Sequence, residues 1–237
     1  MAIGFDLGDT LCEYAGIPLN WEREYPSALA AVAESCRCDL TPERSRSGIE
    51  LLLQYNTRVT PRAEEREFTA EQIFGELISK WALSEELVGS AISAFFGHFT
   101  QTLRAFPEAA GVLSKLRELG VRTGVLTDVP YGMPRPLVVA DIAAAGLAIP
   151  DEQLLTSTTV GYRKPHPAGF RVMAERLGVS CSHLLYVGNE RKDIDGATGA
   201  GCRTALLWRS GSEPPAWGQE STIRSLEQLL ELDYEIP

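Results

Sequence analysis

The stretch GFDLGDTL, residues 4–11, closes an apolar run with two carboxylates, Asp6 and Asp9, that are separated by Leu7 and Gly8. A short apolar run of this kind is typical of a strand that is buried on both faces of a parallel sheet. Polar residues directly after such a strand stand at its carboxyl end, where open α/β sheets bind their ligands. These residues therefore predict a fold class and the place of a site.

Four later apolar runs have the same character, and helical patterns separate them. The predicted strands are Ile3–Leu7, Thr123–Thr127, Leu154–Ser157, Leu184–Val187 and Thr204–Leu207. The predicted helices are Pro107–Leu119, Pro134–Ala145, Pro167–Leu177 and Ile194–Ala200, each followed directly by a glycine that favours a helix end. This alternation predicts an α/β fold with a doubly wound, Rossmann-like parallel sheet and right-handed crossovers.

About ninety residues between the first strand and the helix at Pro107 break this alternation. They show helical periodicity and no convincing strand, in the segments Tyr25–Cys36, Pro42–Tyr55, Ala70–Lys80 and Glu85–Leu103. We expect residues 14–104 to form an all-helical cap domain, inserted into a core domain of residues 1–13 and 105–237. A closing amphipathic helix is expected at Ile223–Leu232.

Composition and charge argue against several classes of protein. Apolar residues make up 44% and charged residues 23% of the chain, as in ordinary globular domains. The net charge of -10 disfavours nucleic acid or an anionic membrane surface as the main partner. No stretch approaches the ~18–20 apolar residues of a membrane span. With no secretory signal pattern and five scattered cysteines, we expect a cytoplasmic protein, whose oligomeric state the sequence does not predict.

Polar side chains follow four of the predicted strands at the point where each strand ends. Asp6 lies at the end of the first strand, Thr127 ends the second, Lys164 lies between the third and fourth, and Asn189 and Asp193 follow the fourth. Each residue alone has an ordinary structural explanation as a helix cap or a turn residue. In a twisted parallel sheet all four groups converge on one cleft, so their joint order indicates a single site.

In this order the four groups resemble the sequence motifs of the haloacid dehalogenase-like hydrolase superfamily, whose members carry a cap between the first two motifs. The resemblance covers residues 1–13 and about 105–237. It implies a phosphatase that depends on Mg²⁺ and hydrolyses a small phosphorylated molecule through an aspartyl-phosphate intermediate.

The resemblance also implies roles for the residues that match the motifs. Asp6 matches the nucleophile, Thr127 the hydroxyl that binds a phosphate oxygen, and Lys164 the cation that neutralises both. The implied ligands of Mg²⁺ are Asp6, the backbone carbonyl of Gly8, Asn189 and Asp193. A carboxylate that approaches a phosphate dianion to ~4 Å is repelled by several kcal/mol even at an effective dielectric of ~20, and these cations cancel that repulsion.

The chain departs from the family's phosphatases at the residue two positions after the nucleophile. A second aspartate usually stands there as general acid and base, which is typically worth ~10²–10⁴-fold in rate, and here the position is Gly8. Asp9 would point to the opposite face of an extended chain, unless the backbone turns sharply at the glycine. We therefore expect a preference for substrates with a good leaving group.

A second departure is Asn189, which stands where the family usually shows the first aspartate of its last motif. Asparagine keeps an oxygen ligand but removes a negative charge, so we expect a weaker affinity for the metal. The adjacent Glu190 is a candidate for compensation.

The cap contains a candidate substrate-binding segment, QYNTRVTPRAEER, residues 54–66. It brings Asn56, Arg58 and Arg62 close together, and arginines bind carboxylates or phosphates well. The ordinary alternative is a solvated loop in a charged stretch.

Three alternative functions stay open. A haloacid dehalogenase shares the fold and the aspartate nucleophile but uses no metal, which would leave the acidic residues after the fourth strand without a purpose. A phosphonatase-type hydrolase needs a Schiff-base lysine in the cap, where Lys80 is the only lysine. A catalytically weak binding protein on the same scaffold is consistent with the two departures.

Overall fold

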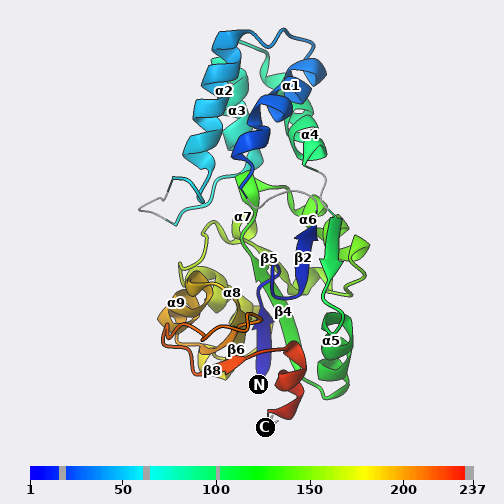
Figure 1. The fold of residues 1–237 in the computed structure, drawn as a ribbon, viewed down its shortest axis with the longest axis vertical. Coiled ribbons are helices and arrows are strands. Elements are labelled where there is room, and N and C mark those ends of the chain that lie inside the picture. The colour runs from blue at the N-terminus through cyan, green and yellow to red at the C-terminus, as the bar shows by residue number, and fades with distance from the viewer. Residues whose placement is uncertain (16–19, 61–64, 100–101, 233–237) are drawn as a thin grey trace.

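The computed structural model describes residues 1–15, 20–60, 65–99 and 102–232, and its centre is a parallel sheet of six strands (Figure 1). The strand order is β5–β4–β1–β6–β7–β8, and every pair is parallel. The strands are β1 (Ala2–Phe5), β4 (Arg122–Thr127), β5 (Leu154–Thr156), β6 (Leu184–Gly188), β7 (Arg203–Leu207) and β8 (Ser221–Ile223). The predicted doubly wound α/β fold is confirmed.

Helices cover both faces of this sheet. They are α5 (Ala109–Glu118), α6 (Arg135–Ala144), α7 (Ser157–Val160), α8 (Ala168–Arg176) and α9 (Arg191–Ala200). Because side chains alternate along a strand, Ile3 and Phe5 pack with α5 and α6, whereas Ala2 packs with α8 and α9. Figure 1 shows α5 and the α8–α9 pair on opposite sides of the sheet.

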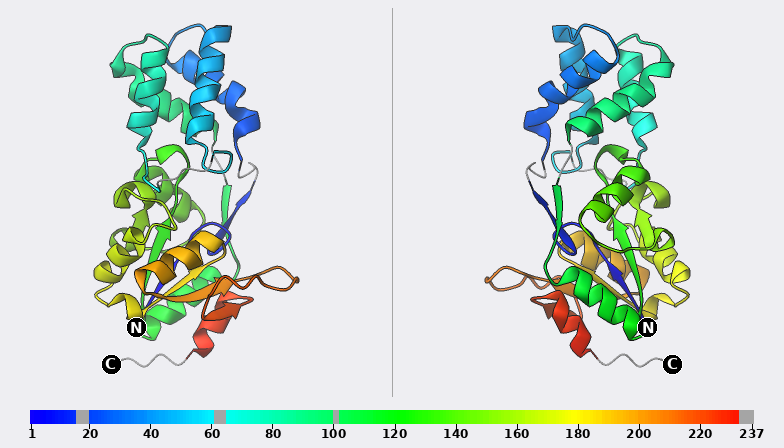
Figure 2. Two further views of the ribbon diagram at one scale, coloured as in Figure 1. Left: turned by 90° about the vertical axis from the view of Figure 1, so that its left-hand side faces the viewer. Right: turned by 90° about the vertical axis from the view of Figure 1, so that its right-hand side faces the viewer.

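A bundle of four helices lies beyond the carboxyl ends of the strands (Figures 1 and 2). It consists of α1 (Tyr25–Ser35), α2 (Pro42–Tyr55), α3 (Ala70–Lys80) and α4 (Val88–His98). The bundle has an apolar core of its own, in which Leu29, Phe74 and Phe95 are fully buried. Residues 14–104 as the limits of a cap domain stay a prediction.

Local signals explain why α2 and α3 begin where the sequence predicts. The Thr41 hydroxyl accepts the N–H of Arg44, and Pro42 occupies the first helical position of α2. Thr69 and Gln72 form a reciprocal capping box at the start of α3. Short 3-10 helices connect other elements, namely η1 (Glu22–Glu24), η2 (Glu85–Leu87), η3 (Pro130–Gly132), η4 (Asp151–Gln153), η5 (Cys181–His183) and η6 (Leu226–Glu231).

A two-stranded antiparallel ribbon joins the bundle to the sheet, where the sequence shows no convincing strand. It pairs β2 (Cys12–Ala15) with β3 (Thr102–Ala105). The helix expected at Glu85–Leu103 is therefore wrong at its C-terminal end: residues 85–87 form a short 3-10 helix, α4 covers Val88–His98, and Leu103 lies in β3. Strands of four residues are too short to reveal a periodicity, and this pair depends on a partner about ninety residues away.

The C-terminal helix expected at Ile223–Leu232 is also wrong. Ile223 ends β8, and η6 follows as a six-residue 3-10 helix. Leu226 and Leu229 are both fully buried against the sheet, and their spacing of three residues suits one 3-10 turn as well as an α-helix. No helix in the described ranges is long and apolar enough to span a bilayer.

Gly132 marks the closest approach between η3 and the start of α3. Its φ is +64°, and a Cβ there would overlap the Phe68 carbonyl oxygen and lie 2.5 Å from the Ala70 nitrogen. Only glycine allows this contact. The contact is one of those that hold the helical bundle against the sheet.

Gly132→Ala is therefore expected to lower the free energy of unfolding by clearly more than the ~1–2 kcal/mol that a left-handed conformation costs a residue with a Cβ. Gly146→Ala is the matched control, because Gly146 has φ +77° and nothing within 4 Å of the added Cβ. Denaturation by urea measures both. Equal losses would contradict the tight contact at Gly132.

Candidate active site

Asp6 is the first residue after β1 and stands at the carboxyl end of the sheet. Its backbone N–H still bonds the Val187 carbonyl of β6 at 2.9 Å, which fixes its position against the neighbouring strand. Its side chain is buried, and its Oδ1 lies 2.6 Å from Nζ of Lys164. Lys164 comes from the loop between α7 and α8, so residues 158 positions apart meet here.

The Lys164 ammonium is shared by two carboxylates. Nζ lies 2.6 Å from Oδ1 of Asp6 and 2.6 Å from Oδ1 of Asp193. Nζ also donates to the Tyr186 hydroxyl at 3.3 Å, and that hydroxyl donates to the Leu126 carbonyl at 2.9 Å. The three ionised side chains form a buried cluster with two negative charges and one positive charge.

This imbalance shifts the protonation equilibria of the cluster. Burial raises the pKa of Asp6 to about 7, although Lys164 pulls it down, and the nearby Asp193 raises it further. Burial alone would lower the pKa of Lys164, but Asp193 and Asp6 together hold it well above its usual range. Lys164 therefore stays charged, and the cluster can accept either a proton or another cation.

The side-chain amide of Asn189 lies near Asp6 and Gly8. Its side-chain amide lies 3.2 Å from Oδ2 of Asp6, and 3.1 Å from both the Gly8 carbonyl oxygen and Oγ1 of Thr10. With its nitrogen inward, the orientation that satisfies the hydrogen bonds of the site, the two amide hydrogens are shared among these three oxygens. With its oxygen inward it accepts from Thr10 and forms an oxygen cluster with Asp6 and Gly8.

With the amide oxygen inward, which is the orientation that a bound cation would require, Asp6 Oδ2, the Gly8 carbonyl and Asn189 Oδ1 would form an oxygen cluster suited to a small divalent cation. The Asn189 amide lies 3.2 and 3.1 Å from the other two oxygens, a spacing that neighbouring oxygen ligands of one Mg²⁺ ion can have. Within the described ranges, no group of three or more His, Cys, Asp or Glu side chains could hold a metal. A cation here would therefore depend on carbonyl and amide oxygens as well as on Asp6.

Asp193 has both carboxylate oxygens engaged. Oδ2 accepts the backbone N–H groups of Asn189 at 3.1 Å and Glu190 at 2.9 Å, and Oδ1 contacts Lys164. The side chain thus caps α9 and holds the Asn189 backbone in place. Its expected role as a metal ligand stays a prediction, because the structure places the carboxylate against Lys164.

Thr127 is buried at the end of β4 and lines the same hollow as Asp6, Gly8 and Asn189, which we call the Asp6 pocket. Its hydroxyl donates to the Asp128 carbonyl at a long 3.4 Å, so it can rotate toward a ligand. The structure thus brings together the four groups that the sequence placed at strand ends.

Asp128 follows Thr127 at the same strand end, and the sequence assigned it no role. Its Oδ1 accepts the Lys164 backbone N–H at 3.1 Å, and its Oδ2 lies 3.2 Å from Nζ of Lys192. Burial would raise its pKa, but Arg163 and Lys192 lower that pKa below the usual value. Arg163 and Lys192 stand beside motif residues in the sequence, and only the structure shows that both face this carboxylate.

The backbone turns sharply after Leu7, so the expectation based on an extended chain fails at Asp9. The Leu7 carbonyl accepts the N–H groups of Leu11 at 2.9 Å and Cys12 at 3.1 Å, and Asp9 has a φ of 56°. Asp9 lines the Asp6 pocket as a result. Its role stays a prediction.

Tyr14 occupies the space that a side chain at position 8 would need. A Cβ on Gly8 would lie 2.8 Å from Cε2 of the Tyr14 ring. An aspartate at position 8 would therefore require this ring to move, so the missing carboxylate and the position of Tyr14 are linked.

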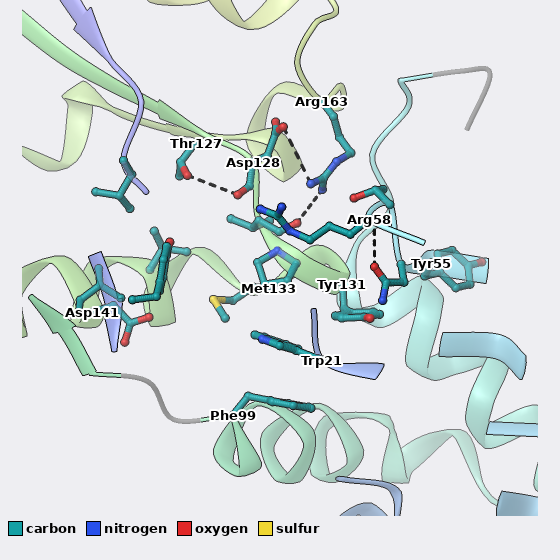
Figure 3. A pocket seen from close by; sticks show the side chains of 18 of the residues that line it. Trp21, Tyr55, Arg58, Phe99, Thr127, Asp128, Tyr131, Met133, Asp141 and Arg163 are labelled. Atoms are coloured by element: carbon teal, nitrogen blue, oxygen red, sulfur yellow. Dashed lines mark hydrogen bonds and ion pairs between the residues drawn. The ribbon is translucent and has the colours of Figure 1, made fainter. Parts of the chain in front are cut away.

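The three cap residues expected to bind substrate do not act as one group. Asn56 uses its amide inside the cap, where Nδ2 donates to the Tyr25 hydroxyl at 2.7 Å and to Asn20 at 3.0 Å. Arg58 is exposed and extends toward Asp128 and Arg163 across the cleft (Figure 3). Arg62 lies outside the described residues.

Lys80 does not lie near Asp6. It forms an exposed ion pair with Glu76 at 3.5 Å on α3. It lines neither the Asp6 pocket nor the neighbouring cavity between the helical bundle and the sheet. The structure therefore gives no support to a Schiff-base role for this lysine.

Comparison with protein families gives a match over most of the chain. Residues 1–201 match a model of the family described as haloacid dehalogenase-like hydrolase. The chain is 34% identical over 116 residues to the phosphoglycolate phosphatase of Pectobacterium atrosepticum, covering 46% of this chain and 47% of that protein. It is 33% identical over 102 residues to the phosphoglycolate phosphatase of Escherichia coli K12, covering 43% and 39%. The matched part thus spans about half, or less, of these relatives.

Solved structures show the same fold. A 2-haloacid dehalogenase from Pseudomonas syringae pv. Tomato DC3000 has a TM-score of 0.62 at 24% identity, covering 97% of this chain and 96% of that one. A HAD phosphatase from Thermococcus onnurineus has a TM-score of 0.57 at 19% identity, with the same coverage of both chains.

Lys164→Met is expected to lower the free energy of unfolding by about 3–5 kcal/mol at pH 8, because it leaves two buried carboxylates without their counter-charge. The loss should shrink toward pH 5. The pKa of Asp6 is raised from its ordinary value of 3.8 to about 7, so the folded protein binds a proton at Asp6 more readily than the unfolded chain does. The free energy of unfolding therefore falls as the pH rises from about 4 to about 7, where Asp6 becomes ionised.

Lys115→Met is the control, since the Lys115–Glu118 pair at 3.0 Å is exposed and should contribute less than about 1 kcal/mol. Chemical denaturation at both pH values measures the two variants. Similar losses in both would show that the Lys164 cluster contributes little.

Proposed function

The chain belongs to the haloacid dehalogenase-like hydrolase family, and on that basis we propose that it is a phosphatase of a small phosphorylated molecule, with Asp6 as nucleophile and Mg²⁺ as cofactor. The observation that carries the proposal is the double engagement of Asp6. One of its oxygens lies 2.6 Å from Nζ of Lys164, and the other lies 3.2 Å from the Asn189 amide, which also contacts the Gly8 carbonyl at 3.1 Å. The phosphatase relatives support this class of reaction.

In the proposed mechanism, a carboxylate oxygen of Asp6 attacks phosphorus, and the bond between phosphorus and the leaving oxygen breaks. Water then hydrolyses the aspartyl-phosphate, which releases inorganic phosphate and restores Asp6. Lys164 holds Asp6 in place and offsets the negative charge that develops around phosphorus. The Thr127 hydroxyl donates to a phosphoryl oxygen.

Mg²⁺ held by Asp6, the Gly8 carbonyl and Asn189 would neutralise phosphoryl charge and polarise the phosphoryl oxygens. Asp193 acts on this arrangement indirectly. It positions Lys164 through one oxygen and the Asn189 backbone through the other.

A consequence of Gly8 is that no carboxylic acid occupies the usual place for protonating the leaving oxygen. The leaving group must then depart as an anion, so its acidity should control how fast the aspartyl-phosphate forms. Asp9 borders the Asp6 pocket and is the alternative source of a proton.

A series of ring-substituted phenyl phosphates tests this proposal, because the size of the leaving group stays nearly constant while its acidity varies. We expect kcat/KM for 4-nitrophenyl phosphate to exceed that for phenyl phosphate by about 100-fold, the low end of what a general acid contributes. Asp6→Asn should abolish turnover of every member. Activity that survives this substitution would exclude Asp6 as the nucleophile.

Asp9→Asn is the matched variant in the same series. It should leave the dependence on leaving-group acidity unchanged. If kcat/KM depends only weakly on leaving-group acidity in the natural protein and strongly in Asp9→Asn, Asp9 is the acid that protonates the leaving oxygen.

Asn189→Asp is expected to increase the affinity for Mg²⁺ by at least about tenfold, or 1.4 kcal/mol, because it restores a negative charge to the oxygen cluster. Calorimetric titration with Mg²⁺ measures this without reference to activity. Glu190→Gln should change the affinity little, since the Glu190 carboxylate lies 2.7 Å from Nζ of Lys192. An unchanged affinity in Asn189→Asp would argue against the oxygen cluster as the metal site.

A further inference from the structure

A cavity of about 130 Å³, which we call the apolar cavity after the aromatic and aliphatic side chains on one of its walls, lies beside the Asp6 pocket, between the helical bundle and the sheet (Figure 3). This apolar wall includes Trp21, Phe99, Leu103, Val129, Met133 and Val138. Polar and charged side chains, among them Asn56, Thr57, Asp128 and Asp141, line the rest. The cavity and the Asp6 pocket share five lining residues, Tyr14, Arg58, Thr127, Asp128 and Lys192. The two spaces therefore adjoin along one wall.

We propose that this apolar cavity binds the leaving group of the substrate, and that this group is uncharged, apolar and about the size of one aromatic ring. The inference rests on the proposed phosphatase function and names the substrate class of that site. The volume supports the size, since an apolar cavity of about 150 Å³ in another protein holds benzene. Loss of water from the ring and from the wall supplies the binding free energy.

The aromatic wall of the cavity is held by contacts among its own rings. Trp21 stacks on Phe99 with ring centroids 4.0 Å apart and planes 9° apart, and on Tyr131 at 5.6 Å and 23°. Tyr131 has a φ of 48°, and its hydroxyl is hydrogen-bonded to that of Tyr25. A wall held this firmly needs little reordering when a ring binds, which favours affinity.

Tyr14 connects this cavity to the reaction centre. Its ring lies against Gly8 and lines both spaces. A substrate whose phosphoryl group lies at Asp6 would therefore direct its leaving group along the Tyr14 ring into the cavity.

The charges around the cavity disfavour a leaving group with a second anion. Each of the three basic side chains in its lining already faces an acidic partner: Arg163 pairs with Glu67, Lys192 with Asp128, and Arg58 with Glu190. The Asp141 carboxylate also lines the cavity, one helical turn after Val138 on α6, and would repel an anion. This distinguishes the chain from its relatives, whose substrate is named as phosphoglycolate, an ester with a carboxylate.

The first test compares benzyl phosphate, ethyl phosphate and 2-phosphoglycolate, which all release alkoxides, so that leaving-group acidity differs little. Burial of the phenyl ring should give benzyl phosphate a kcat/KM about 10- to 100-fold above that of ethyl phosphate. 2-Phosphoglycolate should fall below both. Equal values for the first two, or a preference for 2-phosphoglycolate, would overturn the proposal.

Two adjacent residues of α6 provide a matched pair of variants. Val138 is 4% exposed and lines the cavity, whereas Val139 is 36% exposed. Val138→Phe should bring the ratio of benzyl to ethyl phosphate turnover close to one, and Val139→Phe should leave that ratio unchanged. A ratio that stays high in Val138→Phe would contradict the assignment of the cavity.

A binding measurement on the natural protein keeps the inference testable if Val138→Phe fails to fold. In the presence of Mg²⁺, benzylphosphonate should bind at least tenfold more tightly than methylphosphonate, and Trp21 should report it by fluorescence. The Trp21→Phe variant should lose that signal. If the two phosphonates bind equally well and the protein still hydrolyses phosphate esters, the assignment of the apolar cavity is wrong and the proposed function stands. If benzylphosphonate binds tightly but no phosphate ester is hydrolysed, the proposed function is wrong.

Discussion

The buried ammonium of Lys164, held between Asp6 and Asp193, is the interaction on which the site depends. It joins the end of β1, the loop before α8 and the start of α9, which lie far apart in the sequence. A buried charge without its partner is strongly destabilising, so these three segments must meet when the chain folds. The same contact leaves one carboxylate in excess, and this prepares the pocket for a further cation.

The departures from the family's phosphatase pattern are connected in space. Gly8 leaves room for the Tyr14 ring, and that ring forms the wall between the Asp6 pocket and the apolar cavity. The loss of a carboxylate beside the leaving oxygen and the presence of an apolar surface for the leaving group are therefore two aspects of one local arrangement. Asn189 adds an amide that can either donate to the Asp6 and Gly8 oxygens or join them around a cation.

Contacts between the helical bundle and the sheet set the shape of the cavity. Glu67, which precedes α3, accepts hydrogen bonds from Ser157 at the start of α7 and from Arg163 in the loop after α7. Arg163 also donates to the Val129 carbonyl at 2.7 Å. Val129 itself lines the cavity. The ion pair that attaches the bundle therefore lies at the rim of the proposed binding site, so attachment and specificity depend on the same few groups.

The sequence by itself determined the doubly wound sheet and the four groups at its strand ends, because buried strands and helix caps leave local patterns that do not depend on distant partners. The first residues of α2 and α3 follow from the local capping at Thr41 and Thr69. Only the tertiary structure decided the β2–β3 ribbon, the turn that moves Asp9 into the pocket, and the place of Tyr186 under Lys164. Each of these requires contacts between residues remote in the chain or a backbone turn without a local signal. The apolar cavity was equally hidden, since its lining comes from both the bundle and the sheet.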